Sequence, residues 1–167
     1  KLRFKEAGQY INNALEIYES EYGEFHPFVG IEKSNMSRIL EGTTYDFVQA
    51  EKYLLEALGV FKKAYGTDHY NTATLQVNVM SFYNRRMEYE KALDFYNENS
   101  ETMMASGRIE KVVYFNIRMG ETYLKINQLE KSKQLYLQTL ELAAKKKNTK
   151  LIGRKDLKLK YKGIHCC

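Results

Sequence analysis

The chain contains one segment twice, 43 residues apart, and this repetition limits its possible folds more than any other feature. Residues 4–26 read FKEAGQYINNALEIYESEYGEFH, and residues 47–69 read FVQAEKYLLEALGVFKKAYGTDH. Eight of the 23 aligned positions are identical, where chance would give about one or two. Self-similarity at such a period is typical of stacked supersecondary units. The identical pairs are Phe4/Phe47, Ala7/Ala50, Tyr10/Tyr53, Ala14/Ala57, Leu15/Leu58, Tyr22/Tyr65, Gly23/Gly66 and His26/His69.

Two weaker copies follow, so the repetition extends over most of the chain. The third begins at Tyr89 and places Ala92 42 residues after Ala50, and the fourth places Ser132 40 residues after Ala92. We therefore predict a solenoid over residues 1–146 with an incomplete unit at its N-terminal end, followed by a basic cap or tail over residues 147–167. Its complete helix pairs are expected near 28–66, 70–107 and 108–146.

Apolar residues recur at spacings of three and four throughout the repeats, which predicts helices and an all-α fold. Gly23 and Gly66 follow helical segments and favour the left-handed backbone conformation that ends a helix, and Asn127 is expected to break a later helix. Asn71 or Thr72 is expected to cap the fourth helix. The predicted helices cover residues 4–22, 28–40, 47–65, 72–86, 89–105, 109–125 and 129–146.

Composition excludes some classes of protein. Apolar residues make up 44% of the chain, enough for a core, but no uncharged apolar run approaches the length of a membrane span. The two cysteines, Cys166 and Cys167, are neighbours and cannot staple a fold, which favours a reducing, cytosolic setting. The chain begins with Lys1 and shows no signal-peptide pattern, so we expect it to enter partway through a longer protein.

Two helix pairs carry a pattern that resembles the tetratricopeptide repeat. In the last pair MGxxY (residues 119–123) precedes SxxxY (residues 132–136), and in the pair before it VMxxY (residues 79–83) precedes AxxxY (residues 92–96). Asn116 and Gln76 stand where the family has its signature tryptophan, and the closing proline is missing. The period of 40 to 43 and the recurring YGxxH joint are similar to the longer repeats of kinesin light chains.

The resemblance implies a right-handed α-solenoid of antiparallel helix pairs, whose concave face is lined by the first helix of each pair and binds protein or peptide segments. Amide and guanidinium groups suit that task, because they bond peptide backbone and carboxylates. Asn35, Asn78 and Arg118 are similar to parts of the clamp that holds chaperone carboxylate tails, although Ser34 and Tyr114 replace its lysines. The predicted binding residues are Asn35, Arg38, Thr74, Asn78, Ser81, Arg85, Tyr114, Arg118, Glu121 and Lys125.

No set of residues indicates catalysis. The sequence has no glycine-rich phosphate loop, no HExxH and no CxxC, so we predict no enzyme activity and no cofactor. His26 and His69 recur at turns that enter helices, where bonds to nearby backbone explain them better than a metal. His165, Cys166 and Cys167 are too few and too close together for a closed zinc site, and no metal is expected.

The end of the chain is strongly basic. Residues 143–167 hold nine lysines or arginines and one acid, Asp156, whereas the first 142 residues hold 17 basic and 20 acidic residues. This tail could dock on tubulin, nucleic acid or anionic lipid. Alternatively, the final Cys166-Cys167 resembles the prenylated ending of Rab proteins, or the apolar residues of the tail cap the last repeat. The basic residues are Lys145, Lys146, Lys147, Lys150, Arg154, Lys155, Lys158, Lys160 and Lys162.

These features predict a cytoplasmic, non-catalytic scaffold or adaptor in a larger assembly, cytoskeletal or ciliary by analogy with kinesin light chains. We expect protein or peptide partners, with an acidic surface as a further partner of the tail, rather than a small-molecule substrate, a membrane or a nucleic acid. Two alternatives stay open: a regulatory repeat module of a larger enzyme, and a tail that anchors the chain to anionic membrane, nucleic acid or microtubules.

Overall fold

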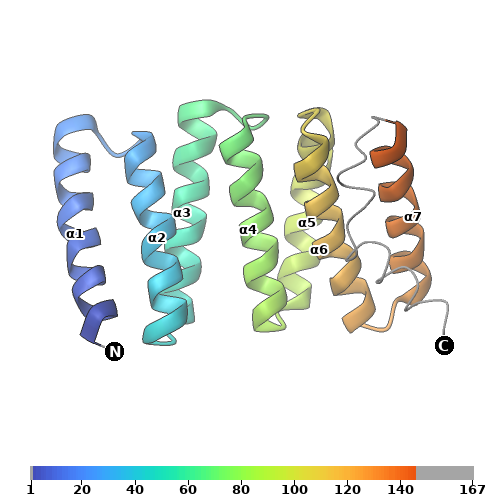
Figure 1. The fold of residues 1–167 in the computed structure, drawn as a ribbon, viewed down its shortest axis with the longest axis horizontal. Coiled ribbons are helices and arrows are strands. Elements are labelled where there is room, and N and C mark those ends of the chain that lie inside the picture. Colours follow the sequence, from blue (N-terminus) through green and yellow to red (C-terminus); the bar gives the residue numbers. More distant parts are fainter. Residues whose placement is uncertain (1, 146–167) are drawn as a thin grey trace. The chain divides into compact units, whose positions relative to one another are not determined.

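A computed structural model describes residues 2–145, which form seven α-helices and no strand. Within each part of the chain, consecutive helices run in opposite directions and are joined by short turns (Figure 1). The chain divides into two compact units after Leu75, within the fourth helix. The all-α prediction is confirmed. The helices are α1 (Leu2–Tyr22), α2 (Pro27–Thr43), α3 (Phe47–Tyr65), α4 (Tyr70–Arg86), α5 (Tyr89–Ala105), α6 (Ile109–Lys125) and α7 (Leu129–Lys145).

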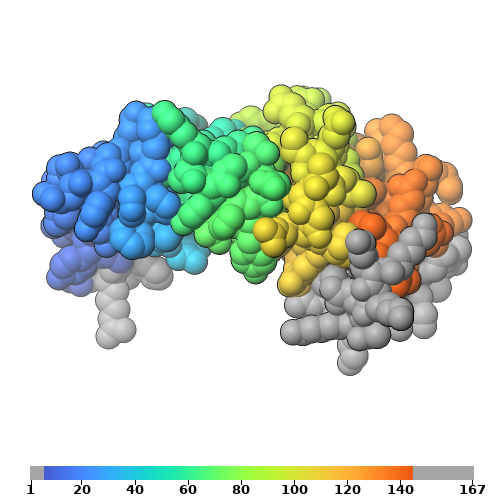
Figure 2. Space-filling model, turned by 90° about the horizontal axis from the view of Figure 1, so that it is seen from above, coloured from blue at the N-terminus to red at the C-terminus, as the bar shows by residue number. Residues whose placement is uncertain are grey.

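The core of unit 1 lies where α2 packs on α3. A Cβ built on Gly30 of α2 would lie 2.5 Å from Phe61 Cε1 and 3.1 Å from Val60 Cγ1, so the missing side chain allows close approach of the two helices. Ala50 of α3 is fully buried, as the repeat pattern predicts for a small residue at a helix crossing. Helix α1 also packs on α2, with the rings of Tyr18 and Phe28 in contact at 5.2 Å between centroids, and both helices are drawn in blue in Figure 2.

Both YGxxH joints lie in unit 1 and share one geometry. Tyr22 stacks on His26 with ring centroids 4.8 Å apart, and Tyr65 stacks on His69 at 4.3 Å. His26 Nδ1 accepts a hydrogen bond from the backbone N–H of Phe28 at 3.3 Å, and His69 Nδ1 accepts the equivalent bond from residue 71 at 3.2 Å. The structural interpretation of both histidines is therefore confirmed.

The predicted cap of α4 is wrong. The helix begins at Tyr70, ahead of Asn71 and Thr72, and His69 provides the side-chain acceptor at its start. The hydroxyl of Thr72 instead donates to the backbone carbonyl of Gly66 at 2.8 Å, which ties the beginning of α4 to the turn before it. An imidazole acceptor is outside the usual set of capping residues, so sequence rules favoured the nearby asparagine and threonine.

Within each helix pair the turn contains a non-glycine residue in the left-handed region. Tyr45, Met87 and Asn127 have φ of 57°, 58° and 59°, each five residues before a buried small residue of the next helix. At Met87 the N–H bonds the carbonyl of Asn84 and the next N–H bonds that of Tyr83, which is the Schellman arrangement. The break predicted at Asn127 is thus confirmed, and the other two were not foreseen.

Unit 2 contains buried polar pairs at equivalent places in its two helix pairs. Gln76 Nε2 of α4 donates to Asn99 Oδ1 of α5 at 3.1 Å, and Asn116 Nδ2 of α6 donates to Thr139 Oγ1 of α7 at 3.1 Å. The partners are 23 residues apart in both cases. Gln76 and Asn116 occupy the positions where the resemblance expects tryptophan. A hydrogen bond between the two helices therefore stands where a large ring would pack.

Aromatic contacts join the two helix pairs of unit 2. The ring of Tyr96 on α5 stacks on Phe115 of α6 with centroids 5.1 Å apart, and Phe95 meets the same ring edge-on at 6.3 Å. The hydroxyl of Tyr96 donates to Asn116 Oδ1 at 3.0 Å, so one side chain contributes both ring packing and a polar contact. Ala92, on the same helix as Tyr96, is fully buried, as predicted.

Candidate peptide-binding site

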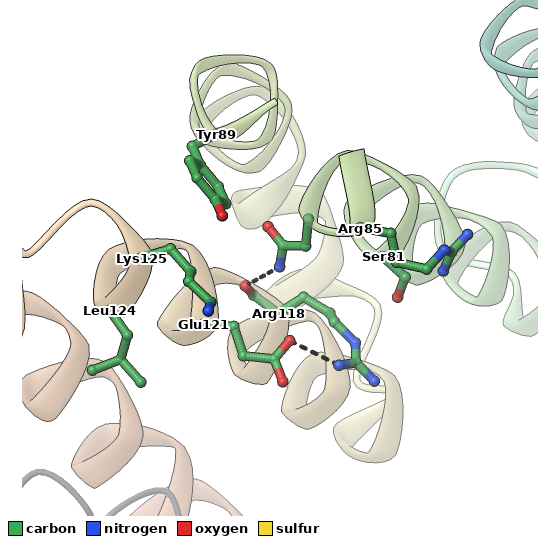
Figure 3. Close-up of a pocket in the computed structure, with 8 residues that line it drawn as sticks. Ser81, Arg85, Tyr89, Arg118, Glu121, Leu124 and Lys125 are labelled. Atoms are coloured by element: carbon green, nitrogen blue, oxygen red, sulfur yellow. Dashed lines mark hydrogen bonds and ion pairs between the residues drawn. The ribbon is translucent and has the colours of Figure 1, made fainter. Parts of the chain in front are cut away.

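A hollow of ≈ 610 Å³ lies between α4 and α6 in unit 2, with Tyr89 of α5 at its edge (Figure 3). The lining side chains come from the last turns of α4 and the second half of α6. Helical spacing explains the set, because residues three or four apart share a helix face. The hollow is lined by Ser81, Asn84, Arg85, Tyr89, Arg118, Glu121, Leu124 and Lys125.

Asn84 fixes the spacing of the two helices that form the hollow. Its Nδ2 donates to the backbone carbonyl of Arg118 at 2.7 Å, and its Oδ1 accepts a hydrogen bond from the Thr122 hydroxyl at 2.6 Å. Both partners lie on α6, so one amide connects α4 to two successive turns of its neighbour. This support holds the lining residues in place without using their own charged groups.

The hollow has an excess of positive charge. Three cationic side chains, those of Arg85, Arg118 and Lys125, lie around it, against one carboxylate, that of Glu121. Glu121 is an ion-pair partner of Arg118, whose Nη1 lies 2.7 Å from Glu121 Oε2, with both side chains partly exposed. The ammonium group of Lys125 forms no ion pair among the described residues. An anion would therefore gain electrostatic attraction in the hollow.

Two larger side chains add an apolar component to the same hollow. Tyr89 lies at the α5 edge and Leu124 on α6, as Figure 3 shows. Ser81 also lines the hollow, and its hydroxyl donates to the carbonyl of Val77 in its own helix at 2.9 Å, so the oxygen remains an acceptor. Cationic groups in the same hollow as apolar side chains suit a ligand that carries a carboxylate close to an apolar side chain.

The structure gathers half of the ten predicted binding residues around this hollow: Ser81, Arg85, Arg118, Glu121 and Lys125. The others lie elsewhere. Asn35 and Arg38 are on α2 in unit 1, where Arg38 Nη2 donates to Asn35 Oδ1 at 2.9 Å and Asn35 Nδ2 donates to Glu32 at 3.2 Å. Thr74 donates to the carbonyl of Tyr70 in its own helix, Asn78 is exposed on α4, and Tyr114 is half-buried on α6. A role in partner binding stays a prediction for all ten.

Sequence reasoning missed three lining residues, Asn84, Tyr89 and Leu124. Asn84 follows Ser81 by three positions, so its place on the same helix face could have been found from spacing. Tyr89 lies on the second helix of its pair, whereas the resemblance implies binding residues on first helices only. Leu124 gives no signal in the sequence, because an apolar residue at a lining position looks like one at a core position.

Other predicted features fall outside what the structure describes or have no counterpart in it. The basic residues from Lys146 to Lys162 and the ending His165-Cys166-Cys167 lie beyond the described residues, as does the side chain of Lys145. None of the described helices combines the length and apolar character that crossing a membrane requires. Between residues 2 and 145 no three His, Cys, Asp or Glu side chains gather in a way that could hold a metal ion.

Comparison with solved structures shows the same fold. No protein-family model matches the sequence, and no curated protein matches it. The chain is similar to BtubC (BKLC) from P. vanneervenii, with a TM-score of 0.73 and 19% identity over 87% of this chain, and it spans 58% of that protein. It is also similar to two structures of nearly identical TPR-like repeats of a Podosopora anserina protein described as a kinesin light chain. One of them, a variant form, gives a TM-score of 0.67 and 16% identity, and the match covers 85% of this chain and 68% of that one. The other gives a TM-score of 0.66 and 14% identity, and the match covers 97% of this chain and 87% of that one. The chain is therefore built of TPR-like repeats.

Proposed function

We propose that this chain is a non-catalytic protein-interaction module whose α4–α6 hollow binds a peptide segment carrying a carboxylate beside an apolar side chain. The observation that carries the proposal is the composition of the hollow: three cations and one acid together with the apolar surfaces of Tyr89 and Leu124. TPR-like repeats generally bind proteins or peptides, which supports the proposal at the level of fold.

The arrangement favours an extended segment over a free small molecule. The polar groups of the hollow come from residues 81–85 of α4 and 118–125 of α6, so a ligand several residues long can contact both helices together. Lys125 supplies a charge for the ligand's carboxylate, while the Arg118 guanidinium is already oriented by Glu121. Orientation before binding lowers the entropy lost when the ligand is held.

We extend the proposal to a cytoplasmic scaffold within a larger, cytoskeletal or ciliary assembly. The likeness to kinesin light chain repeats supports this context, by analogy of fold alone. The cytoplasmic part is supported by the two cysteines, which are adjacent and cannot cross-link distant parts of a fold. The absence of a catalytic role is part of the same proposal, since repeats of this kind typically serve as scaffolds.

Fluorescence anisotropy with labelled ten-residue peptides tests the binding site. Each peptide has two acidic residues flanking a leucine or a phenylalanine, and its control has the matching amides. We expect the acidic peptides to bind and the amide peptides to bind much more weakly. Lys125→Ala should weaken binding by about tenfold, because it removes one charge-assisted contact.

Lys131→Ala is the matched control, because Lys131 is exposed on α7, outside the hollow. It removes the same charge and should leave the dissociation constant unchanged. Equal affinity for acidic and amide peptides, or equal losses from the two lysine variants, would contradict the proposal. Circular dichroism of both variants shows whether the fold is intact.

A further inference from the structure

A second groove of unit 2, of ≈ 430 Å³, lies between α5 and α7 and is distinct from the α4–α6 hollow. Its walls come from residues 96–104 of α5 and 135–142 of α7, among them Glu101 and Met104 from α5 and Leu135, Glu141 and Leu142 from α7. Asn116, held by the hydroxyl of Tyr96, lies at the α6 side of the groove. The groove therefore offers both apolar side chains and carboxylates.

The charge of this groove is opposite to that of the hollow. Glu101 and Glu141 are exposed, and no cationic side chain of the described residues lines the groove. Neither carboxylate forms an ion pair or a hydrogen bond among the described residues. Such a surface would attract a segment in which basic residues are interleaved with apolar ones, because each kind of side chain would find its counterpart.

The chain itself contains such a segment, Arg154–Lys162, which reads RKDLKLKYK. From Leu157 onward apolar and basic residues alternate, so in an extended conformation Leu157, Leu159 and Tyr161 share one face and three lysines share the other. These residues lie outside the described part of the chain, and only their sequence enters the argument. It matches the groove in both charge and apolar content.

The connection is long enough for the segment to reach the groove. Helix α7 forms one wall through Leu142 and ends three residues later at Lys145, so the following chain leaves from the end of the groove. Residues 146–153 can span about 26 Å at roughly 3.3 Å per residue when extended. The 17 residues of α7 measure about 26 Å at 1.5 Å per residue, so the link can reach any part of that wall.

We propose that Arg154–Lys162 docks in the α5–α7 groove of its own chain, with the apolar residues against Met104, Leu135 and Leu142 and the lysines near Glu101 and Glu141. The proposal does not depend on peptide binding in the α4–α6 hollow. If the basic segment binds this groove, an external acidic surface must compete with the groove to bind the segment.

Limited trypsin digestion of the full chain, followed by mass spectrometry, tests this docking. We expect cleavage after Lys158 and Lys160 to be slow in the wild-type chain. In the double variant Glu101→Gln/Glu141→Gln it should become about fivefold faster, because two exposed ion pairs are lost. The control Asp94→Asn/Glu98→Gln removes two exposed acids of α5 that do not line the groove, and it should leave the rate unchanged.

The amide variants add no trypsin site and alter only exposed side chains, and their circular dichroism confirms that they fold. Equal cleavage rates in the wild type and the Glu101/Glu141 variant would overturn the proposal. Protection that increases with protein concentration would assign the groove to the segment of a second copy and would overturn docking within one chain. Unchanged protection in 0.5 M salt would also contradict it, because exposed ion pairs are screened at about that ionic strength.

Discussion

Gly120 of α6 lies directly against the ring of Tyr136 of α7. A Cβ built on Gly120 would overlap Tyr136 Cε1 and lie 2.9 Å from the hydroxyl oxygen of the same ring, closer than real Cβ atoms approach. Ser132 Oγ also donates to the carbonyl of Gly120 at 2.9 Å, and Tyr136 is fully buried. This contact sets how closely α6 and α7 can pack, in the same way that Gly30 and Phe61 do in unit 1.

Gly120→Ala should destabilise the chain by about 1–3 kcal/mol, because the added methyl group forces a fully buried ring to move. Urea unfolding followed by circular dichroism measures the change. Gly59→Ala is the control: a Cβ there meets no atom within 4 Å, and alanine should stabilise α3 by about 0.5–1 kcal/mol. A loss of the same size in both variants would refute the proposed role of the Gly120 contact.

Asn116→Leu should lower the free energy of unfolding by about 1–3 kcal/mol, since it removes the acceptor of the half-buried Tyr96 hydroxyl and the donor to Thr139. A double-mutant cycle with Thr139→Val separates the part that belongs to the α6–α7 hydrogen bond. We expect a coupling energy of about 0.5–1.5 kcal/mol. Asn97→Leu, an exposed position on α5, should change stability by less than about 0.5 kcal/mol. Zero coupling would show that the buried pair is dispensable.

Met87→Asn should stabilise the chain by about 0.5–1 kcal/mol, on the scale of the penalty for left-handed backbone. Met87 has φ of 58° and is 72% exposed, so it carries this strain without contributing packing. Asparagine adopts the conformation more readily, as Asn127 does in the equivalent turn. The measurement is the thermal midpoint of unfolding. Val48→Asn, on a helical position of α3 that is 78% exposed, should give no gain, and a gain there equal to that at Met87 would contradict the argument.

Stability should fall as pH rises from about 10 to about 12. Burial raises the pKa of Tyr96 and that of Tyr136 to about 12 from the ordinary value of 10.0. In that window the unfolded chain loses tyrosine protons that the folded chain keeps, so ionisation favours unfolding. Ionisation of each tyrosine should lower the free energy of unfolding by about 2 kcal/mol by about pH 12. In the double variant Tyr96→Phe/Tyr136→Phe, stability should decline less steeply with pH than in the wild type, each protein being compared with its own stability at about pH 9. Parallel declines would show that these two tyrosines do not cause the pH dependence.

The helices could be predicted from the sequence to within a few residues, because their signals are local. Gly23 and Gly66 have φ of 84° and 89°, as expected for helix stops, and the apolar spacing places α5 and α6 at their observed bounds. The left-handed Met87 could not be predicted, because methionine has no preference for that conformation and only the packing of α4 on α5 requires it. A structural role could be predicted for His69, but not that its ring would accept the hydrogen bond at the start of α4 in place of a capping Asn71 or Thr72.

The candidate site was less predictable, because it depends on which helix faces meet. Five of the predicted residues line the α4–α6 hollow, whereas Tyr89 reaches it from α5, the second helix of a pair. The repeats, most helix ends and the small residues at crossings follow from the sequence, since periodicity and turn preferences act over a few residues. The bond from Asn84 to α6 and the shared groove of Glu101 and Glu141 depend instead on how neighbouring helices pack, because they bring together residues 34 to 40 positions apart.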